Sequence, residues 1–183
     1  MLFKGCGINI VTPFTDTNEV DFDSLGRLVD TYINIGAKAL ILGRTTGEFF
    51  AMSDNEILEV VDFVVKRADK RLPVLAQTGL NDTSRSVVLS IRARALGLDG
   101  LIIASPYYSQ GNELGLISHF KSIALAGGLP AYIDNDPART GFNLEPSLIA
   151  KLAEIPNIAG IIESSSDLDH LADLSPIIND DFV

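Results

Sequence analysis

Two adjacent threonines and two closely spaced aspartates are the polar residues of this chain with the clearest chemical use. Thr45 and Thr46 precede Gly47 in the segment GRTTGEFF, where hydroxyl and backbone N–H groups can form a nest for a carboxylate. Asp134 and Asp136 lie in the segment DNDPARTG. One of these carboxylates can act as a general base towards a bound substrate. These segments therefore predict a site for a small anionic molecule.

Each segment also has a purely structural interpretation. The threonines can form an ordinary turn before a helix that starts at Ser53. The two aspartates can form a salt-bridged polar plug with Arg44 and Arg139, because unpaired carboxylates are costly to bury. In the catalytic interpretation the same arginines, or Gln77, stabilise developing negative charge. The sequence leaves both interpretations open.

Two further groups of residues are candidates for a role in the site. Tyr107 and Tyr108 follow a proline and can form an aromatic plug or an oligomer contact. Glu48 can join the two aspartates as an oxygen ligand for a metal ion, but no histidine accompanies them. His119 lies beside a phenylalanine in a helical segment, and His170 lies in a late helical segment. We therefore expect no metal and no cofactor.

The elements that must position these residues are short apolar runs that lack polar alternation. Such runs are typical of strands in a parallel sheet that is buried on both faces, and they start roughly thirty residues apart. Segments of helical period separate them, and Ser53 with Glu56 forms a capping-box pattern. Pro146 is expected in the first turn of another helix. The expected strands are 7–11, 39–43, 73–77, 100–104, 131–135 and 158–162.

This order of elements predicts a (β/α)8 TIM barrel in which residues 1–183 form a single incomplete domain of about six and a half βα units. A seventh strand is expected to begin in the segment NDDFV. Because an incomplete barrel exposes strand edges, we expect either a longer chain or a second chain to complete it. The reactive groups of such barrels lie at the carboxyl ends of the strands.

Composition narrows the class of partner. The chain has 183 residues, 46% of them hydrophobic, a formal net charge of -10 and a pI near 4.5. An acidic surface argues against nucleic acid and anionic membrane, because both require a basic face. Cys6 is the single cysteine, and neither a secretory signal nor a transmembrane run is visible. We expect a cytoplasmic protein with a small-molecule partner.

Several stretches together resemble one protein family. VTPF, TTGE, TGLND, SPYYSQGNELGLISHF, DPARTG and NIAGIIE occur in this order. They are similar to the dihydrodipicolinate synthase and N-acetylneuraminate lyase family of (β/α)8 aldolases, and the PYY and RTG motifs place the resemblance nearest to the dihydrodipicolinate synthase branch. The resemblance runs from residue 5 to residue 183, whereas chains of this family are longer by about a third of their length.

The resemblance implies roles for individual residues in pyruvate-dependent lyase chemistry of lysine and diaminopimelate biosynthesis. A lysine on the sixth strand forms a Schiff base with pyruvate, and a tyrosine on the fifth strand relays protons. The relay continues through Thr46 and through a tyrosine lent by a neighbouring subunit, which corresponds to Tyr108. Thr45 corresponds to the threonine that holds the pyruvate carboxylate, and Arg139 to the arginine that meets the aldehyde substrate's carboxylate.

Two departures remove the central groups of that mechanism. The family carries GIKE where this chain has GIIE, so Ile162 occupies the position of the Schiff-base lysine. It carries YNVP where this chain has DNDP, so Asp134 occupies the position of the relay tyrosine. An isoleucine side chain cannot attack a carbonyl group, and no other lysine of the sequence is an obvious substitute.

Further departures from the family sequence are expected at the same end of the barrel, where the carboxyl ends of the strands lie. Arg44 and Gln77 stand where the family usually has glycine, Asn9 where it has alanine, and Asp136 where it has valine. Such clustering indicates that a site was replaced, by engineering or by divergence, because random decay would scatter the changes. Two classes remain open: a homo-oligomeric barrel without the parent lyase activity, and an enzyme with a new acid–base site built on the aspartates.

Overall fold

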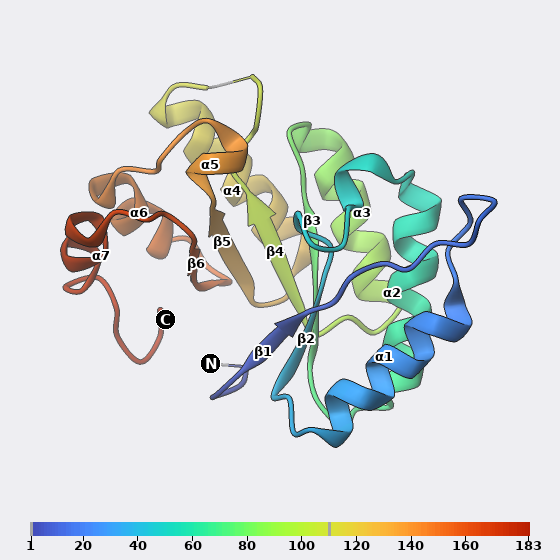
Figure 1. Ribbon diagram of the computed structural model, residues 1–183. Coiled ribbons are helices and arrows are strands. Elements are labelled where there is room, and N and C mark those ends of the chain that lie inside the picture. Colours follow the sequence, from blue (N-terminus) through green and yellow to red (C-terminus); the bar gives the residue numbers. More distant parts are fainter. Residues whose placement is uncertain (1, 110) are drawn as a thin grey trace. The chain divides into compact units, whose positions relative to one another are not determined.

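Strands alternate with helices along the chain in the computed structural model, which describes residues 2–109 and 111–183 (Figure 1). The structure divides into two compact units. The N-terminal unit contains residues 2–77 and 92–100, and the C-terminal unit contains residues 78–91 and 101–183.

The N-terminal unit is built from three parallel strands and the helices that follow the first two. Its strands are in register, so that Asn9 pairs with Ile41 and Ile41 pairs with Leu75. Thr78 and Gly79, the last two residues of the third strand, belong to the C-terminal unit. The elements are β1 (Gly7–Asn9), α1 (Phe22–Asn34), β2 (Ala39–Leu42), the 3-10 helix η1 (Phe49–Ala51), α2 (Asp54–Ala68) and β3 (Val74–Gly79).

Local sequence explains where these helices begin. The Asp21 side chain accepts a hydrogen bond from the Ser24 N–H at the start of α1. At the start of α2, the Glu56 N–H donates to Ser53 Oγ and the Ser53 N–H donates to Glu56 Oε2 at 2.8 Å. The predicted capping box is thus confirmed, and it satisfies two backbone donors that a helix start leaves unpaired.

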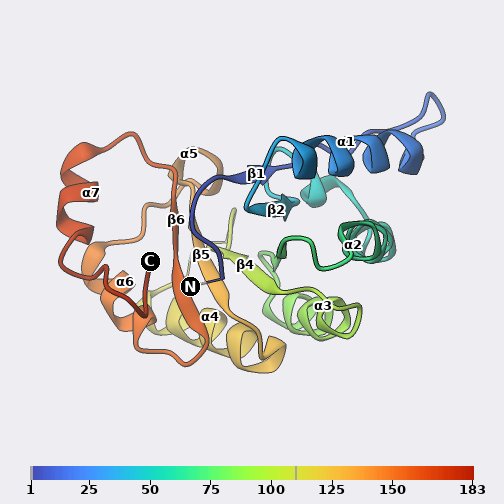
Figure 2. The same ribbon diagram turned by 90° about the horizontal axis from the view of Figure 1, so that it is seen from below.

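The C-terminal unit contains two further parallel strand pairs, β4 with β5 and β5 with β6. Helix α6 lies beside β6, and α7 lies beside α6 (Figure 2). The predicted proline in the first turn of α6 is confirmed at Pro146. Residues 92–95 of α3 and Gly100 of β4 belong to the N-terminal unit. The elements are α3 (Thr83–Ala95), β4 (Gly100–Ala104), α4 (Glu113–Gly127), β5 (Ala131–Asn135), α5 (Pro137–Thr140), α6 (Pro146–Ala153), β6 (Ile158–Glu163) and α7 (Leu168–Leu174).

The predicted strands are confirmed with small differences at their ends. β1 ends at Asn9, two residues early, although the Ile10 N–H still donates to the Ile41 carbonyl at 2.9 Å. β3 extends to Gly79 and β6 to Glu163. In the expected seventh strand, the Val183 N–H donates to the Ala159 carbonyl and the Val183 carbonyl accepts from the Ile161 N–H at 2.7 Å. Val183 therefore begins to pair with β6.

Within residues 2–109 and 111–183, no helix combines the length and the apolar character that crossing a bilayer requires.

Candidate functional site

The turn after β2 carries the two threonines and is held by backbone hydrogen bonds. The Gly47 N–H donates to the Gly43 carbonyl at 2.8 Å, and Thr12 Oγ1 donates to the Gly47 carbonyl at 2.7 Å. Arg44 has a φ of 54°, a left-handed conformation that is unusual for a residue with a side chain. The Thr45 and Thr46 side chains are exposed at the tip of this turn.

One part of the predicted carboxylate nest is wrong. The Gly47 N–H is used to close the turn onto Gly43, so it does not face a ligand. The close approach of the two backbones requires glycine at position 47, because a Cβ there would lie 2.7 Å from the Gly43 backbone nitrogen. A carboxylate at this turn would therefore depend on the two threonines.

Asn9 and Gln77 lie on one face of the N-terminal unit's strands. Asn9 is level with Ile41 and Leu75, and Gln77 is two residues beyond Leu75, so all four side chains share a face. Gln77 is 0% exposed, and neither atom of its amide has a hydrogen-bond partner among the described residues. Asn9 Oδ1 is likewise buried without a partner in that part of the chain. These unpaired amides are costly to bury.

Asp134 and Ile162 lie side by side in the C-terminal unit. Asp134 on β5 pairs with Ile162 on β6, and paired residues of parallel strands point to the same face. Asp134 is 4% exposed, whereas Ile162 is partly exposed. The sequence predicts residue 134 on the fifth strand and residue 162 on the sixth, and the strand register brings these two positions side by side.

Asp136 and Arg139 lie beyond the end of β5. Asp136 precedes α5, and its carbonyl accepts hydrogen bonds from the N–H groups of Arg139 and Thr140 at 3.0 and 2.9 Å. Because Asp136 has left the strand, strand alternation does not fix its side chain on the face of Asp134. The Arg139 side chain is exposed.

The tyrosine pair after β4 divides into one partly buried and one exposed side chain. Burial raises the pKa of the Tyr107 hydroxyl. Tyr108 is 96% exposed and has a φ of 67°. The strained backbone presents this ring to solvent, an arrangement that suits a contact with another molecule rather than an internal plug.

A buried polar network on the opposite face of β5 and β6 was missed by the sequence analysis. Asn135 Nδ2 donates to Asn143 Oδ1 at 2.8 Å and to Glu163 Oε2 at 2.7 Å, while Asn135 Oδ1 accepts from the Leu144 N–H at 3.1 Å. His170 Nε2 on α7 lies 3.2 Å from Glu163 Oε2. We call Asn135, Asn143, Glu163 and His170 the β5–β6 network. Its only sequence signal was the adjacency of Asn135 and Glu163 to positions 134 and 162.

His119 is a buried histidine outside this network. Its predicted position in a helix beside Phe120 is confirmed, with the two rings edge to face and their centroids 5.6 Å apart. His119 Nδ1 lies 2.8 Å from Thr83 Oγ1. Burial lowers the pKa of His119, because the protonated ring would lose its hydration.

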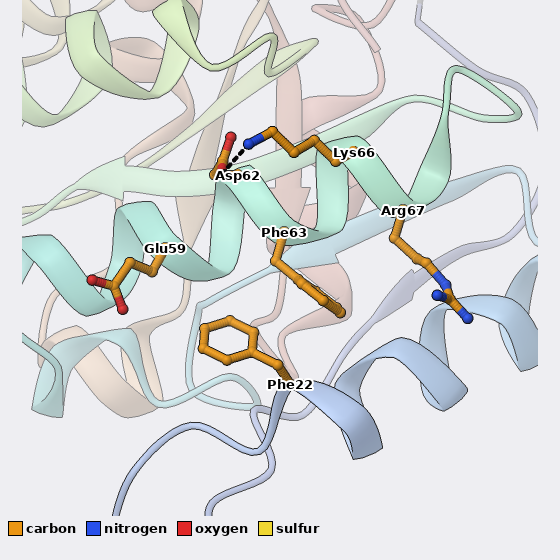
Figure 3. A pocket seen from close by; sticks show the side chains of 6 residues that line it. All are labelled: Phe22, Glu59, Asp62, Phe63, Lys66 and Arg67. Atoms are coloured by element: carbon orange, nitrogen blue, oxygen red, sulfur yellow. Dashed lines mark hydrogen bonds and ion pairs between the residues drawn. The ribbon is translucent and has the colours of Figure 1, made fainter.

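A groove of about 530 Å³ in the N-terminal unit lies away from the predicted site residues, between α1 and α2 (Figure 3). The Phe22 and Phe63 rings meet there with centroids 5.0 Å apart. Lys66 is paired with Asp62 at 2.6 Å, and Arg67 is paired with an aspartate of α1. The cations of this groove are therefore already neutralised.

The structure thus brings the predicted residues together in two groups. Asn9, Gln77 and the turn with Arg44 belong to the N-terminal unit, and Asp134 with Ile162 belongs to the C-terminal unit. Across the ranges 2–109 and 111–183, no group of three histidine, cysteine, aspartate or glutamate side chains could hold a metal ion.

Comparisons with known proteins agree on one family. Residues 2–183 match the Dihydrodipicolinate synthetase family. The chain is 44% identical over 174 residues to the 4-hydroxy-tetrahydrodipicolinate synthase of Caldicellulosiruptor bescii, covering 95% of this chain and 59% of that protein. It is 38% identical over 178 residues to the enzyme of that name from Staphylococcus saprophyticus, covering 97% and 60% of the two chains.

The structure also superposes on a crystal structure of dihydrodipicolinate synthase from Aquifex aeolicus with a TM-score of 0.94 at 34% identity. This match covers 98% of this chain and 61% of the other. The predicted (β/α)8 fold class is confirmed by these matches. The chain spans about three fifths of the length of the relatives it matches.

Proposed function

Because this chain belongs to the dihydrodipicolinate synthetase family, we propose that it derives from a pyruvate-dependent lyase of lysine and diaminopimelate biosynthesis whose Schiff-base site has been replaced, by engineering or by divergence. In this proposal the protein binds a small carboxylate but does not form an imine with it. The observation that carries the proposal is the pairing of Asp134 with Ile162 at the ends of β5 and β6. Neither side chain can serve as an amine nucleophile.

The positions of the lysines support the loss of imine chemistry. The two lysines of the C-terminal unit are Lys121 on α4 and Lys151 on α6, and Lys151 is paired with Glu113 at 2.5 Å. In the N-terminal unit, Lys66 lies on α2, Lys70 follows that helix, and Lys38 precedes β2. Lys4 precedes β1. These positions place no amine at the carboxyl end of a strand.

The exposed threonine turn supports the retained carboxylate site. Thr45 and Thr46 keep their hydroxyl groups accessible on a turn that is fixed by Thr12 and Gly43. Preorganised hydroxyl and N–H groups bind an anion at low entropic cost. Arg44 adds positive charge on the same turn, which favours an anionic ligand.

Carbon-13 NMR with pyruvate labelled at C2 tests this proposal. We expect the ketone and hydrate resonances of pyruvate to broaden on addition of the protein, because the carboxylate binds and exchanges. A Thr45→Val variant removes one hydroxyl at nearly constant volume and should reduce the broadening. A separate imine resonance with the unaltered chain would contradict the proposal.

A second candidate function rests on the burial of Asp134. A carboxylate that is 4% exposed at the end of a barrel strand is a candidate general base, with Asp136 following two residues later. In this alternative the chain is an enzyme that abstracts protons from activated carbon acids. A panel of such substrates tests it: turnover that an Asp134→Asn variant abolishes would support the alternative over the inactive barrel.

We also propose that the chain self-associates through the segment that carries Tyr107 and Tyr108. The support is the 96% exposure of Tyr108 on a strained backbone. Light scattering at micromolar concentration should give a mass above that of the 19.7 kDa monomer. A monomer whose mass a Tyr108→Ser variant does not change would count against the proposal.

A further inference from the structure

The pairing of β5 with β6 contains an irregularity just before the candidate site. Ala131 pairs with Ile158, but the next residue, Tyr132, pairs with Gly160. Ala159 is therefore an extra residue in β6, as in a β-bulge. From Tyr132 onwards the register is regular, so residue 134 pairs with residue 162.

The apolar side chains of β6 do not by themselves select this register. If the extra residue moved beyond Asn135, Asp134 would pair with Ile161 instead of Ile162. Both candidates are isoleucines, so the side chain beside Asp134 would be the same in either register. Gly160, opposite Tyr132, contributes to the selection, because a Cβ at this position would clash with the Val183 carbonyl oxygen. At the strand ends, the selection must come from residues that differ between the two registers.

The β5–β6 network supplies that difference. In the observed register Asn135 pairs with Glu163, and their side chains are hydrogen-bonded at 2.7 Å. In the shifted register Asn135 would pair with Ile162, whose side chain offers no acceptor. Glu163 Oε1 also accepts from the Ser165 N–H at 2.7 Å, which fixes the carboxylate from the following loop.

Hydrogen counting assigns the tautomer of His170. The two amide hydrogens of Asn135 are used by Asn143 and Glu163. The 3.5 Å approach of Asn135 Nδ2 to His170 Nε2 is therefore a contact between two donors, and His170 Nε2 carries a hydrogen that it donates to Glu163 Oε2. Glu163 thus receives donors from β5, from α7 and from the loop between β6 and α7.

We propose that Asn135, Glu163 and His170 are positioning residues that hold the β5–β6 register and thereby place residue 162 beside residue 134. They act from the face opposite these two residues, because neighbouring residues of a strand point to opposite faces. The inference rests on the proposed function in one respect, which is that this function makes positions 134 and 162 important. The register itself is a property of the strand pair.

Cysteine cross-linking measures the register directly. Paired Cα atoms of neighbouring strands lie about 4.8 Å apart, within the range that a disulfide spans. In a Cys6→Ser background, the Asp134→Cys/Ile162→Cys variant reports the observed register and the Asp134→Cys/Ile161→Cys variant reports the shifted one. We expect the first to form a disulfide on mild oxidation and the second to stay reduced, because its thiols point to opposite faces.

Adding Glu163→Leu should change the ratio of the two cross-linking yields about tenfold or more towards the shifted pair, as the loss of buried hydrogen bonds predicts. His170→Leu should act in the same direction and more weakly. Glu163→Gln keeps an oxygen acceptor for Asn135 and should preserve the observed register. Leu152→Ala, in the core of α6 outside the network, controls for a general loss of stability and should leave the ratio unchanged.

An unchanged ratio in both Glu163→Leu and His170→Leu, at a lowered melting temperature, would overturn the inference and leave the network a purely stabilising role. If Glu163→Leu does not fold, the ratio of cross-linking yields in His170→Leu decides whether the network holds the register or only stabilises the fold. The readout does not depend on pyruvate. A pyruvate imine in a chain with the observed register would therefore contradict the proposed function alone, and a shifted ratio without any imine chemistry would leave the inference intact.

Discussion

Gln77 on β3 and Asn135 on β5 both carry a carboxamide side chain at 0% exposure, but their hydrogen bonding differs. Asn135 bonds through both its amide nitrogen and its amide oxygen to partners in the C-terminal unit. Gln77 bonds through neither atom to any described residue. A satisfied buried amide stabilises a fold, whereas an unsatisfied one destabilises it. Asn135 therefore contributes to the stability of the C-terminal unit, whereas the Gln77 amide has no compensating hydrogen bond among the described residues.

The largest expected effect is the removal of the satisfied amide. Asn135→Leu keeps the side chain's shape but removes one hydrogen bond each from the Leu144 N–H, Asn143 and Glu163. We expect the free energy of unfolding to fall by about 3 kcal/mol, measured by urea denaturation. A loss below about 1 kcal/mol would mean that the network contributes little to stability.

The matched change at the unsatisfied amide should have the opposite sign. Gln77→Met replaces the carboxamide by an apolar group of similar length and removes two buried atoms without partners. We expect the free energy of unfolding to rise by about 1 to 2 kcal/mol in the same denaturation experiment. A decrease of similar size would show that Gln77 is paired in solution, and the comparison with Asn135 would then fail.

Helix caps provide a baseline that should not differ between the units. Ser53 Oγ accepts from the Glu56 N–H in the N-terminal unit, and Asn112 Oδ1 accepts from the Gly115 N–H at 2.9 Å in the C-terminal unit. Ser53→Ala and Asn112→Ala should each lower the free energy of unfolding by about 1 kcal/mol. Unequal losses would indicate that the two units unfold separately, which probes placed in each unit would resolve.

The smallest expected effect is a dependence on pH that arises in the C-terminal unit, which contains both histidines of the chain. Burial lowers the folded-state pKa of His119 below its ordinary value of 6.5. The unfolded chain therefore binds a proton more readily, so this contribution to stability is complete above pH 6.5 and is lost as the pH falls through that value.

The matched variants for this effect are His119→Gln and Ser53→Ala. The difference in the free energy of unfolding between pH 7.5 and pH 5.5 should be smaller in His119→Gln than in the unaltered chain. Ser53→Ala should lower stability without changing that difference, since the hydroxyl does not titrate. Equal pH dependence in His119→Gln would contradict the assignment of the effect to His119.

The strands and helices were predictable because apolar runs, the Ser53–Glu56 pair and Pro146 are local signals. The placement of residue 134 on the fifth strand and of residue 162 on the sixth was also predictable, since the family motifs locate both residues, whereas their pairing came only from the register. The β5–β6 network was not, because Asn135, Glu163 and His170 meet only once the strand register is known. The use of the Gly47 N–H was missed for a similar reason, as it depends on how the turn closes onto Gly43.

The proposed loss of Schiff-base chemistry is tested most directly by borohydride reduction in the presence of pyruvate, followed by intact-mass measurement. Borohydride converts an imine between a lysine and pyruvate into a stable secondary amine, so even a small imine population accumulates as an adduct. Loss of this chemistry predicts that the chain keeps its unmodified mass after prolonged treatment. A pyruvate-dependent adduct that peptide mapping places on a single lysine would contradict it.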